Sequence, residues 1–139
     1  MYEENSGVLG KPFNPIINAK KTACLNNFYR KEIWTGEFSQ ITVMSIAPGG
    51  EIGLEFHDDL DQILVVEYGI ASVYSGKTKN TVNFNGTANN ECAIIIPAST
   101  YHNIINEQAY PLKLLSFYAP PKHPVGTIHK TKFESDLND

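Results

Sequence analysis

The sequence has little that would commit it to a nucleic acid or a membrane. Its 11 Lys and Arg residues are outnumbered by 15 Asp and Glu residues, which gives a formal net charge of -4. No local run of basic residues compensates, so we expect no nucleic-acid partner, because such a partner requires a basic face. No apolar stretch approaches the roughly 20 residues of a membrane-spanning helix, so we expect no membrane partner either.

Cysteine and secretory features are also scarce. Cys24 and Cys92 lie far apart and match no CxxC pattern, whereas small secreted scaffolds use more cysteines. We expect both to be reduced structural thiols. The first residues, MYEENSGVLG, contain two acids and no apolar core, which argues against a secretory signal. These features predict a cytoplasmic location.

What the sequence does contain is typical of one β-rich domain. Its 139 residues suit a single domain, and with 42% hydrophobic and 19% charged residues it can form a packed core. Short apolar or alternating runs are separated by Gly, Pro or Asn, a pattern typical of an all-β sandwich or barrel. The predicted strands are Gln40–Ala47, Glu51–His57, Gln62–Tyr68, Ala71–Tyr74, Thr81–Phe84, Cys92–Ile96, His102–Asn106 and Leu112–Tyr118.

The two ends differ from this central pattern. Residues 1–20 have no clear period and predict an N-terminal arm or an edge strand, and the barrel core is expected at about residues 33–119. Residues 120–139 form a tail that begins with three nearby prolines, which cannot occupy a central strand. We expect this tail to wrap the surface and its last residues to be mobile.

Polar residues with ligand chemistry gather around His57. On a strand, Glu55 and His57 would project from the same face. If Asp58–Asp61 is a hairpin loop, His57 and Gln62 would oppose each other with Cβ atoms about 5 Å apart, close enough to share an ion. Asp61 has the wrong parity for that arrangement. A carboxylate is nevertheless a better metal ligand than an amide, so Asp61 stays as the alternative to Gln62.

The spacing around His57 is one half of a longer pattern. Gly49, Glu55-x-His57, Gln62 and Gly69 match the spacing of the first motif of the cupin superfamily. Alone, an exposed polar hairpin end would explain Glu55 and His57 equally well.

The second half lies after the predicted strand Cys92–Ile96. Pro97, Ser99, His102 and Asn106 match the second cupin motif, Pro-x-Gly-x-x-His-x-x-x-Asn. Because the two motifs occur in order, residues of about 40–118 resemble a cupin. The whole chain resembles the small cupins labelled mannose-6-phosphate-isomerase-like. This resemblance implies a double-stranded β-helix, the cupin jelly-roll barrel.

The resemblance also implies a ligand set. The metal ligands of the family fall on Glu55, His57, Gln62 and His102, although Glu55 replaces the usual first His and Gln62 stands where Glu is commoner. Ser99 also replaces the Gly of the second motif. The set offers two imidazoles, one carboxylate and one amide oxygen. Such mixed N/O sites suit Mn, Fe, Ni, Co or Zn.

Three functions fit such a centre. A divalent ion used as a Lewis acid would suit isomerase or lyase chemistry on a small sugar or sugar acid. A set of two His and one carboxylate also suits an Fe(II) dioxygenase. The third possibility is a non-catalytic module that binds a metal or a small ligand. Whether the protein is an enzyme stays open at this level.

Two expectations concern the tail and the assembly. His123 and His129 are either solvated surface residues or, if the tail folds across the barrel mouth, His129 lines the site; the candidate base is His129 or an unligated Glu55. Small cupins commonly pair their sheet edges, so the resemblance implies a homodimer.

Overall fold

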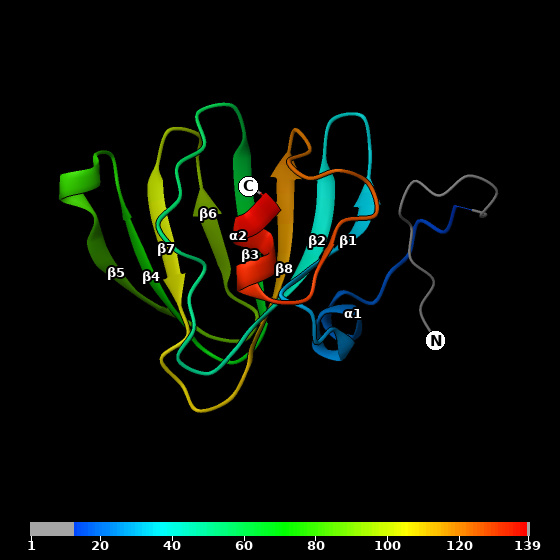
Figure 1. Ribbon diagram of the computed structural model, residues 1–139, viewed down its shortest axis with the longest axis horizontal. Helices are drawn as coiled ribbons and strands as arrows, with labels where there is room; N and C mark the ends of the chain where they lie inside the picture. Colours follow the sequence, from blue (N-terminus) through cyan, green and yellow to red (C-terminus); the bar gives the residue numbers. More distant parts are fainter. Residues whose placement is uncertain (1–12, 139) are drawn as a thin grey trace.

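The computed structural model describes residues 13–138, whose strands form two β-sheets that face each other (Figure 1). The six-stranded sheet has the order β6 (Ala93–Ile96), β3 (Asp61–Tyr68), β8 (Leu112–Ala119), β2 (Gln40–Ile46), β1 (Arg30–Thr35), β9 (Ile128–His129). The three-stranded sheet has the order β5 (Asn83–Ala88), β4 (Ala71–Gly76), β7 (Tyr101–Ile105). All neighbouring strands are antiparallel. The prediction of an all-β barrel-like domain is confirmed.

The main hydrophobic core fills the space between the two sheets. A second core lies on the outer face of the six-stranded sheet. The inner core combines residues of both sheets, such as Leu64 of β3 and Ile104 of β7. On the outer face, helix α1 (Ala19–Leu25) covers Val43 with its buried Ala23. The side chain of Asn18 caps this helix by accepting a hydrogen bond from the Lys21 N–H at 3.0 Å. No helix was expected from the sequence at this position.

The other helices are shorter than a membrane span. They are the 3₁₀ turn η1 (Lys79–Thr81) and helix α2 (Lys132–Asn138). Across residues 13–138, no helix has the length and apolar character needed to cross a bilayer. Both cysteines are free, as expected.

The predicted strand Glu51–His57 is wrong as a regular strand. This segment meets β7 through two isolated bridges, Glu51 with Ile105 and Glu55 with His102. Between them Gly53 has a φ of 101°, and its N–H donates to the side chain of Asn103 instead of to a backbone carbonyl. A left-handed residue breaks the regular ladder, so the predicted hairpin with β3 does not form. β3 pairs with β6 and β8.

The predicted strand Thr81–Phe84 is also wrong in its bounds, and the Asn and Gly residues after it do not end a strand, as such residues between the predicted runs were expected to do. Thr81 ends the 3₁₀ turn, and β5 runs straight through Asn85 and Gly86. Val73 pairs with Gly86 and Tyr74 with Phe84, which leaves Asn85 as an extra residue. Gly86 has a φ of 131°. The Asn-Gly pair therefore makes a β-bulge in place of a hairpin turn.

The tail is more regular than its composition suggested. After the prolines it forms β9, which pairs with β1, and then helix α2. Inside α2 the side chain of Ser135 is buried and accepts a hydrogen bond from Arg30 at 2.6 Å. The predicted mobile end is thus a packed helix up to Asn138, and Asp139 lies outside the described residues. Residues 1–12 of the predicted arm lie outside them as well.

Candidate metal centre

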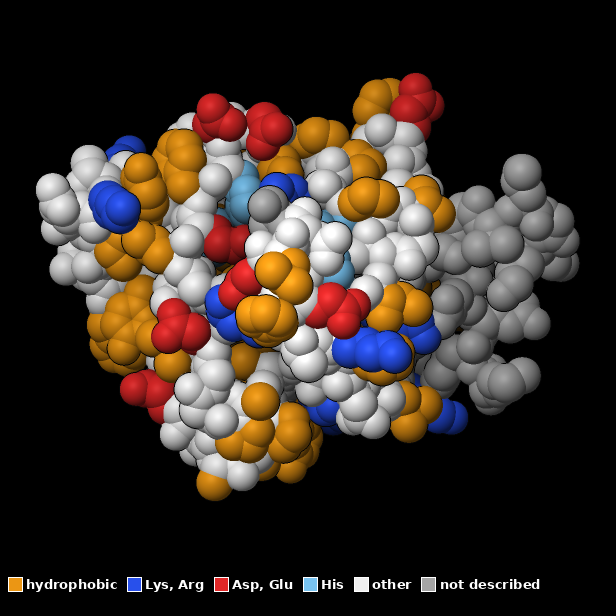
Figure 2. Space-filling view, in the orientation of Figure 1, with side chains coloured by type: hydrophobic (Ala, Val, Ile, Leu, Met, Phe, Trp, Pro, Cys, Tyr) orange, Lys and Arg blue, Asp and Glu red, His pale blue; other side chains and the backbone are white. Residues whose placement is uncertain are grey.

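The inner face of the larger sheet becomes polar toward β1. Residues paired across β3, β8, β2 and β1 form three ranks: Gln62, Tyr118, Gln40; Leu64, Ser116, Thr42, Glu32; and Val66, Leu114, Met44, Arg30. The β3 end of these ranks is largely apolar, whereas the β2 and β1 end carries hydroxyl, carboxylate and guanidinium groups. Figure 2 shows histidine side chains, in pale blue, recessed near the middle of this face of the molecule.

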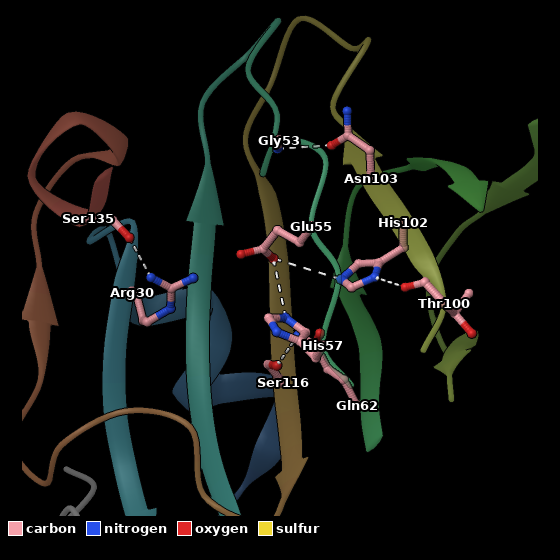
Figure 3. A network of polar contacts seen from close by, with 10 residues as sticks. All are labelled: Arg30, Gly53, Glu55, His57, Gln62, Thr100, His102, Asn103, Ser116 and Ser135. Atoms are coloured by element: carbon pink, nitrogen blue, oxygen red, sulfur yellow. Dashed lines mark hydrogen bonds and ion pairs between the residues drawn. The ribbon is translucent and has the colours of Figure 1, made fainter. Parts of the chain in front are cut away.

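Glu55 and His102 form a directly opposed pair. The Glu55 N–H donates to the His102 carbonyl at 2.9 Å, and the His102 N–H donates to the Glu55 carbonyl at 3.0 Å. Opposed residues of an antiparallel pair project to the same side. Accordingly, the carboxylate Oε1 of Glu55 lies 3.8 Å from Nε2 of His102 (Figure 3).

His57 reaches the same point from the end of the segment. Its Nε2 lies 3.9 Å from Oε1 of Glu55, and its ring centroid is 5.4 Å from that of His102. The His57 carbonyl accepts a hydrogen bond from the Ser99 N–H at 2.7 Å. Ser99 has a φ of 64°, which is the left-handed conformation that the Gly of the second motif would adopt most easily.

The three residues form a compact donor set. Glu55, His57 and His102 each offer one ligand atom, and all three atoms lie within 4.8 Å of one another. Two ligand atoms bound to one ion at about 2.0–2.2 Å stand roughly 3.4 Å apart at a tetrahedral angle. The observed separations of 3.8 and 3.9 Å exceed that value by an amount that small side-chain rotations close. The donors therefore fit a divalent ion.

Both imidazoles are in the form that binds metals. Nδ1 of His102 lies 3.0 Å from the Thr100 carbonyl, which can only accept, so Nδ1 carries the proton and Nε2 presents a lone pair. That Nε2 is buried without a hydrogen-bond partner. Burial lowers the pKa of His102, and burial together with the neighbouring His102 lowers the pKa of His57 to about 4. Both rings are therefore neutral at pH 7.

Gln62 and Asp61 point to different places. Gln62 is 3% exposed, and its Nε2 donates to Ser116 Oγ at 2.9 Å while its Oε1 is buried without a partner. Figure 3 places this side chain beside His57. Asp61 is exposed and accepts a hydrogen bond from the Ala98 N–H at 2.9 Å. The free oxygen thus belongs to Gln62, and Asp61 holds the turn that follows β6.

A second polar group lies beside these donors. Arg30 and His129 are 3% and 8% exposed, and the Arg30 amino group lies 3.2 Å from Nδ1 of His129. Guanidinium nitrogens only donate, so Nδ1 accepts and the His129 ring is neutral. Figure 3 shows the Arg30 guanidinium extending from β1 toward Glu55. Arg30 was not predicted as a site residue, because the charged residues at positions 30 and 32 do not fit the apolar pattern from which the strands were predicted.

The tail is fastened over this group by side chains of β1 and β2. The Gln40 amide donates to the His123 carbonyl at 2.6 Å and accepts from the N–H groups of His123 and Lys122 at 2.9 and 3.1 Å. The Glu32 carboxylate accepts from the Gly126 N–H at 3.0 Å. His123 consequently lies between Tyr118 and His129, with ring centroids 5.3 and 6.2 Å away.

Two relatives each match nearly the whole of this chain. The protein YrkC of Bacillus subtilis is 42% identical over 135 residues, which cover 95% of this chain and 73% of YrkC. The crystal structure of BH2720 from Bacillus halodurans is 41% identical, covers 95% of this chain and 98% of its own, and has a TM-score of 0.88. No model of a known protein family matches the chain.

More distant structures identify the fold. A Klebsiella pneumoniae protein with a double-stranded β-helix domain matches 85% of this chain and 99% of its own at 18% identity, with a TM-score of 0.61. The cupin domain of Cnp3 from Schizosaccharomyces pombe matches 65% and 62% at 15% identity and 0.56. Oxalate decarboxylase of B. subtilis, which has Mn(II) centres, matches 63% and 23% at 14% identity and 0.57. This chain therefore belongs to the same family as YrkC and BH2720, and its fold is the double-stranded β-helix of cupin domains.

Proposed function

We propose that this protein binds one divalent metal ion through Glu55, His57, Gln62 and His102, and that it is an enzyme acting on a small sugar or sugar acid. The observation that carries the proposal is the meeting of two neutral imidazoles and a carboxylate within 4.8 Å. The unpartnered oxygen of Gln62 supplies a fourth donor. Four protein donors of this kind suit Mn, Fe, Ni, Co or Zn and leave positions for a substrate.

The ion, when bound, would polarise a hydroxy-carbonyl group of the substrate as a Lewis acid, which suits isomerase or lyase chemistry. The protein groups fix the donors. The Thr100 carbonyl orients the His102 ring, and Ser116 orients the Gln62 amide by accepting from its nitrogen. Such outer contacts set the direction of the ligand lone pairs. The side chains of His57 and Glu55 are 11% and 26% exposed, so a small solute reaches the donors from solvent.

The Mn(II) centres of oxalate decarboxylase support the proposal at the level of fold, because they occur in a protein of the same architecture. A sugar phosphate is the competing substrate class. His129 stays the candidate base, although its Nδ1 is occupied by Arg30.

Metal analysis of the purified protein is the first test. We expect one transition-metal ion per chain by inductively coupled plasma mass spectrometry, and turnover in a screen of sugar acids and sugar phosphates. A protein without bound metal after incubation with Mn, Fe, Ni, Co and Zn would contradict the proposal. A metal-bound protein without turnover would make it a binding module.

A second candidate is an Fe(II) dioxygenase. Two His and one carboxylate, as in Glu55, His57 and His102, are the ligand set that such enzymes use. Oxygen consumption by the iron-loaded protein, recorded with each acid of the same screen, separates this candidate from the first.

We also propose that the chain acts as a homodimer in the cytoplasm. The free thiols of Cys24 and Cys92 support the location. Strand β6 is at the edge of the larger sheet, and its Ile95 is 72% exposed. An exposed apolar edge strand is typical of a pairing surface.

A further inference from the structure

Two buried polar atoms of the barrel interior have no role in holding a metal ion. They are Oγ1 of Thr42 and Nε2 of His123, and neither has a hydrogen-bond partner. Thr42 is 0% exposed and lies on the same inner face of the sheet as Arg30. A buried polar group without a partner destabilises the fold unless something else satisfies it. These two atoms therefore mark a place for a ligand beside the proposed metal centre.

Arg30 is held rigidly at the same place. One of its amino groups donates to Ser135 Oγ at 2.6 Å and lies 3.2 Å from Nδ1 of His129. Its guanidinium points from β1 toward the carboxylate of Glu55 (Figure 3). A planar guanidinium fixed in this way is prearranged to bind a carboxylate, because little side-chain freedom is lost on binding.

With a divalent ion bound, the charges of the inner face favour the binding of an anion. The buried charged groups on the inner face are Arg30 and Glu32, and Glu55 adds a second carboxylate at the mouth. The imidazoles of His57 and His102 add no charge when they bind an ion, because a metal-binding imidazole is neutral and presents a lone pair. A divalent ion would change the net charge of this group from one negative to one positive. A bound monoanion would bring this net charge to zero. A phosphate monoester carries nearly two negative charges at pH 7.5 and would make the net charge negative.

We propose that the space between Glu55 and β1 binds the carboxylate of a small hydroxy acid, with Arg30 as its cation and Thr42 and His123 as hydrogen-bonding partners. This inference rests on the proposed function and names its substrate class. Ser135 is a positioning residue, because its hydroxyl holds the guanidinium, and His129 contacts the same amino group of Arg30. Helix α2 thereby becomes part of the site.

The test is calorimetric titration of the full-length protein, with and without bound metal, using D-gluconate, D-glucose and glucose 6-phosphate. We expect gluconate to bind and glucose to bind at least about tenfold more weakly. The variant Arg30→Met should weaken gluconate binding by about tenfold or more while the metal content stays at one ion per chain. Lys31→Met, which removes the adjacent cation on the opposite face of β1, is the matched control and should bind gluconate like the wild type.

Thr42→Val is a second variant that tests the inference even if Arg30→Met does not fold. It removes a buried hydroxyl that has no partner, so the melting temperature should not fall, yet gluconate binding should weaken several-fold. A purely structural Thr42 would give the opposite pattern.

The outcomes separate the two proposals. This inference is overturned, and the metal centre stays intact, if the protein binds metal but Arg30→Met leaves the affinity for gluconate unchanged. The same holds if the wild type binds metal but does not bind gluconate. Arg30-dependent gluconate binding without any bound metal overturns the metal centre alone. Tighter binding of glucose 6-phosphate than of gluconate would assign the site to phosphate and overturn the carboxylate assignment.

Discussion

Glu55 and His102 exchange both of their backbone hydrogen bonds, at 2.9 and 3.0 Å, and this single bridge brings their side chains together. The bridge joins an irregular segment to strand β7. His57 follows Glu55 by two residues, so this one bridge places a carboxylate and two imidazoles at the same point. The candidate centre is therefore a consequence of backbone register.

Removing His102 should remove the metal. His102→Ala deletes the ligand whose Nε2 is buried without a partner, and we expect the bound metal to fall to a small fraction of one ion per chain, measured by mass spectrometry. His123→Ala is the matched control, since this histidine lies between Tyr118 and His129. Equal metal content in His102→Ala and the wild type would place the ion elsewhere.

Gln62 and Asp61 should behave differently. Gln62→Ala removes the buried amide oxygen, so we expect about a tenfold or greater loss of metal affinity in a competition assay with a chromogenic chelator. Asp61→Ala removes only the acceptor of the Ala98 N–H, so it should keep wild-type metal affinity and lose about 1 kcal/mol of unfolding free energy. The reverse result would restore Asp61 as the ligand.

Asn106 should be important for stability and irrelevant to the metal. Its buried Nδ2 contacts the carbonyls of Ile46, Ala47 and Tyr110 at 3.1, 3.2 and 2.8 Å. Asn106→Ala leaves these groups unsatisfied, so we expect urea denaturation to show a loss of about 2–4 kcal/mol. Metal stoichiometry at low temperature should not change. A loss of metal from a folded Asn106→Ala protein would refute this division of roles.

The protein should become more stable as the pH rises from about 4 to 6.5. Burial lowers the pKa of His57 to about 4 and that of His123 to about 3 in the folded state. The ordinary value of about 6.5 holds when the chain is unfolded. The unfolded chain therefore binds more protons in this window, and acid favours unfolding.

Urea denaturation of the metal-free protein at several pH values measures this slope. His123→Gln removes one contributor, so its unfolding free energy should depend less steeply on pH than that of the wild type. Identical slopes for the two proteins would show that His123 titrates normally in the folded state.

The oligomeric state can be tested at strand β6. If two copies pair through this edge, Ile95→Lys should place a charge in the interface and convert a dimer into a monomer, as seen by light scattering after size exclusion. Lys77→Ala, an exposed substitution at the end of the other sheet, is the control. A wild-type protein that is monomeric at micromolar concentration would contradict the expected homodimer.

Local sequence determined most of the barrel. Strands β2, β3, β6 and β8 begin and end within a few residues of the predicted runs, because Val, Ile and Leu between turn residues favour strands. The resemblance to two cupin motifs likewise pointed to one site at Glu55, His57 and His102. Each strand and each motif is recognised from residues a few positions apart.

Tertiary structure decided what pairs with what. The sequence placed His57 opposite Gln62, whereas Gly53 sends that segment along β7 and leaves Gln62 between Ile96 and Tyr118. Arg30 and Ser135 stand at opposite ends of the chain and meet only because β9 closes onto β1. Composition and spacing describe the properties of short segments. A contact between distant segments depends on how the whole barrel closes, and no short segment carries that information.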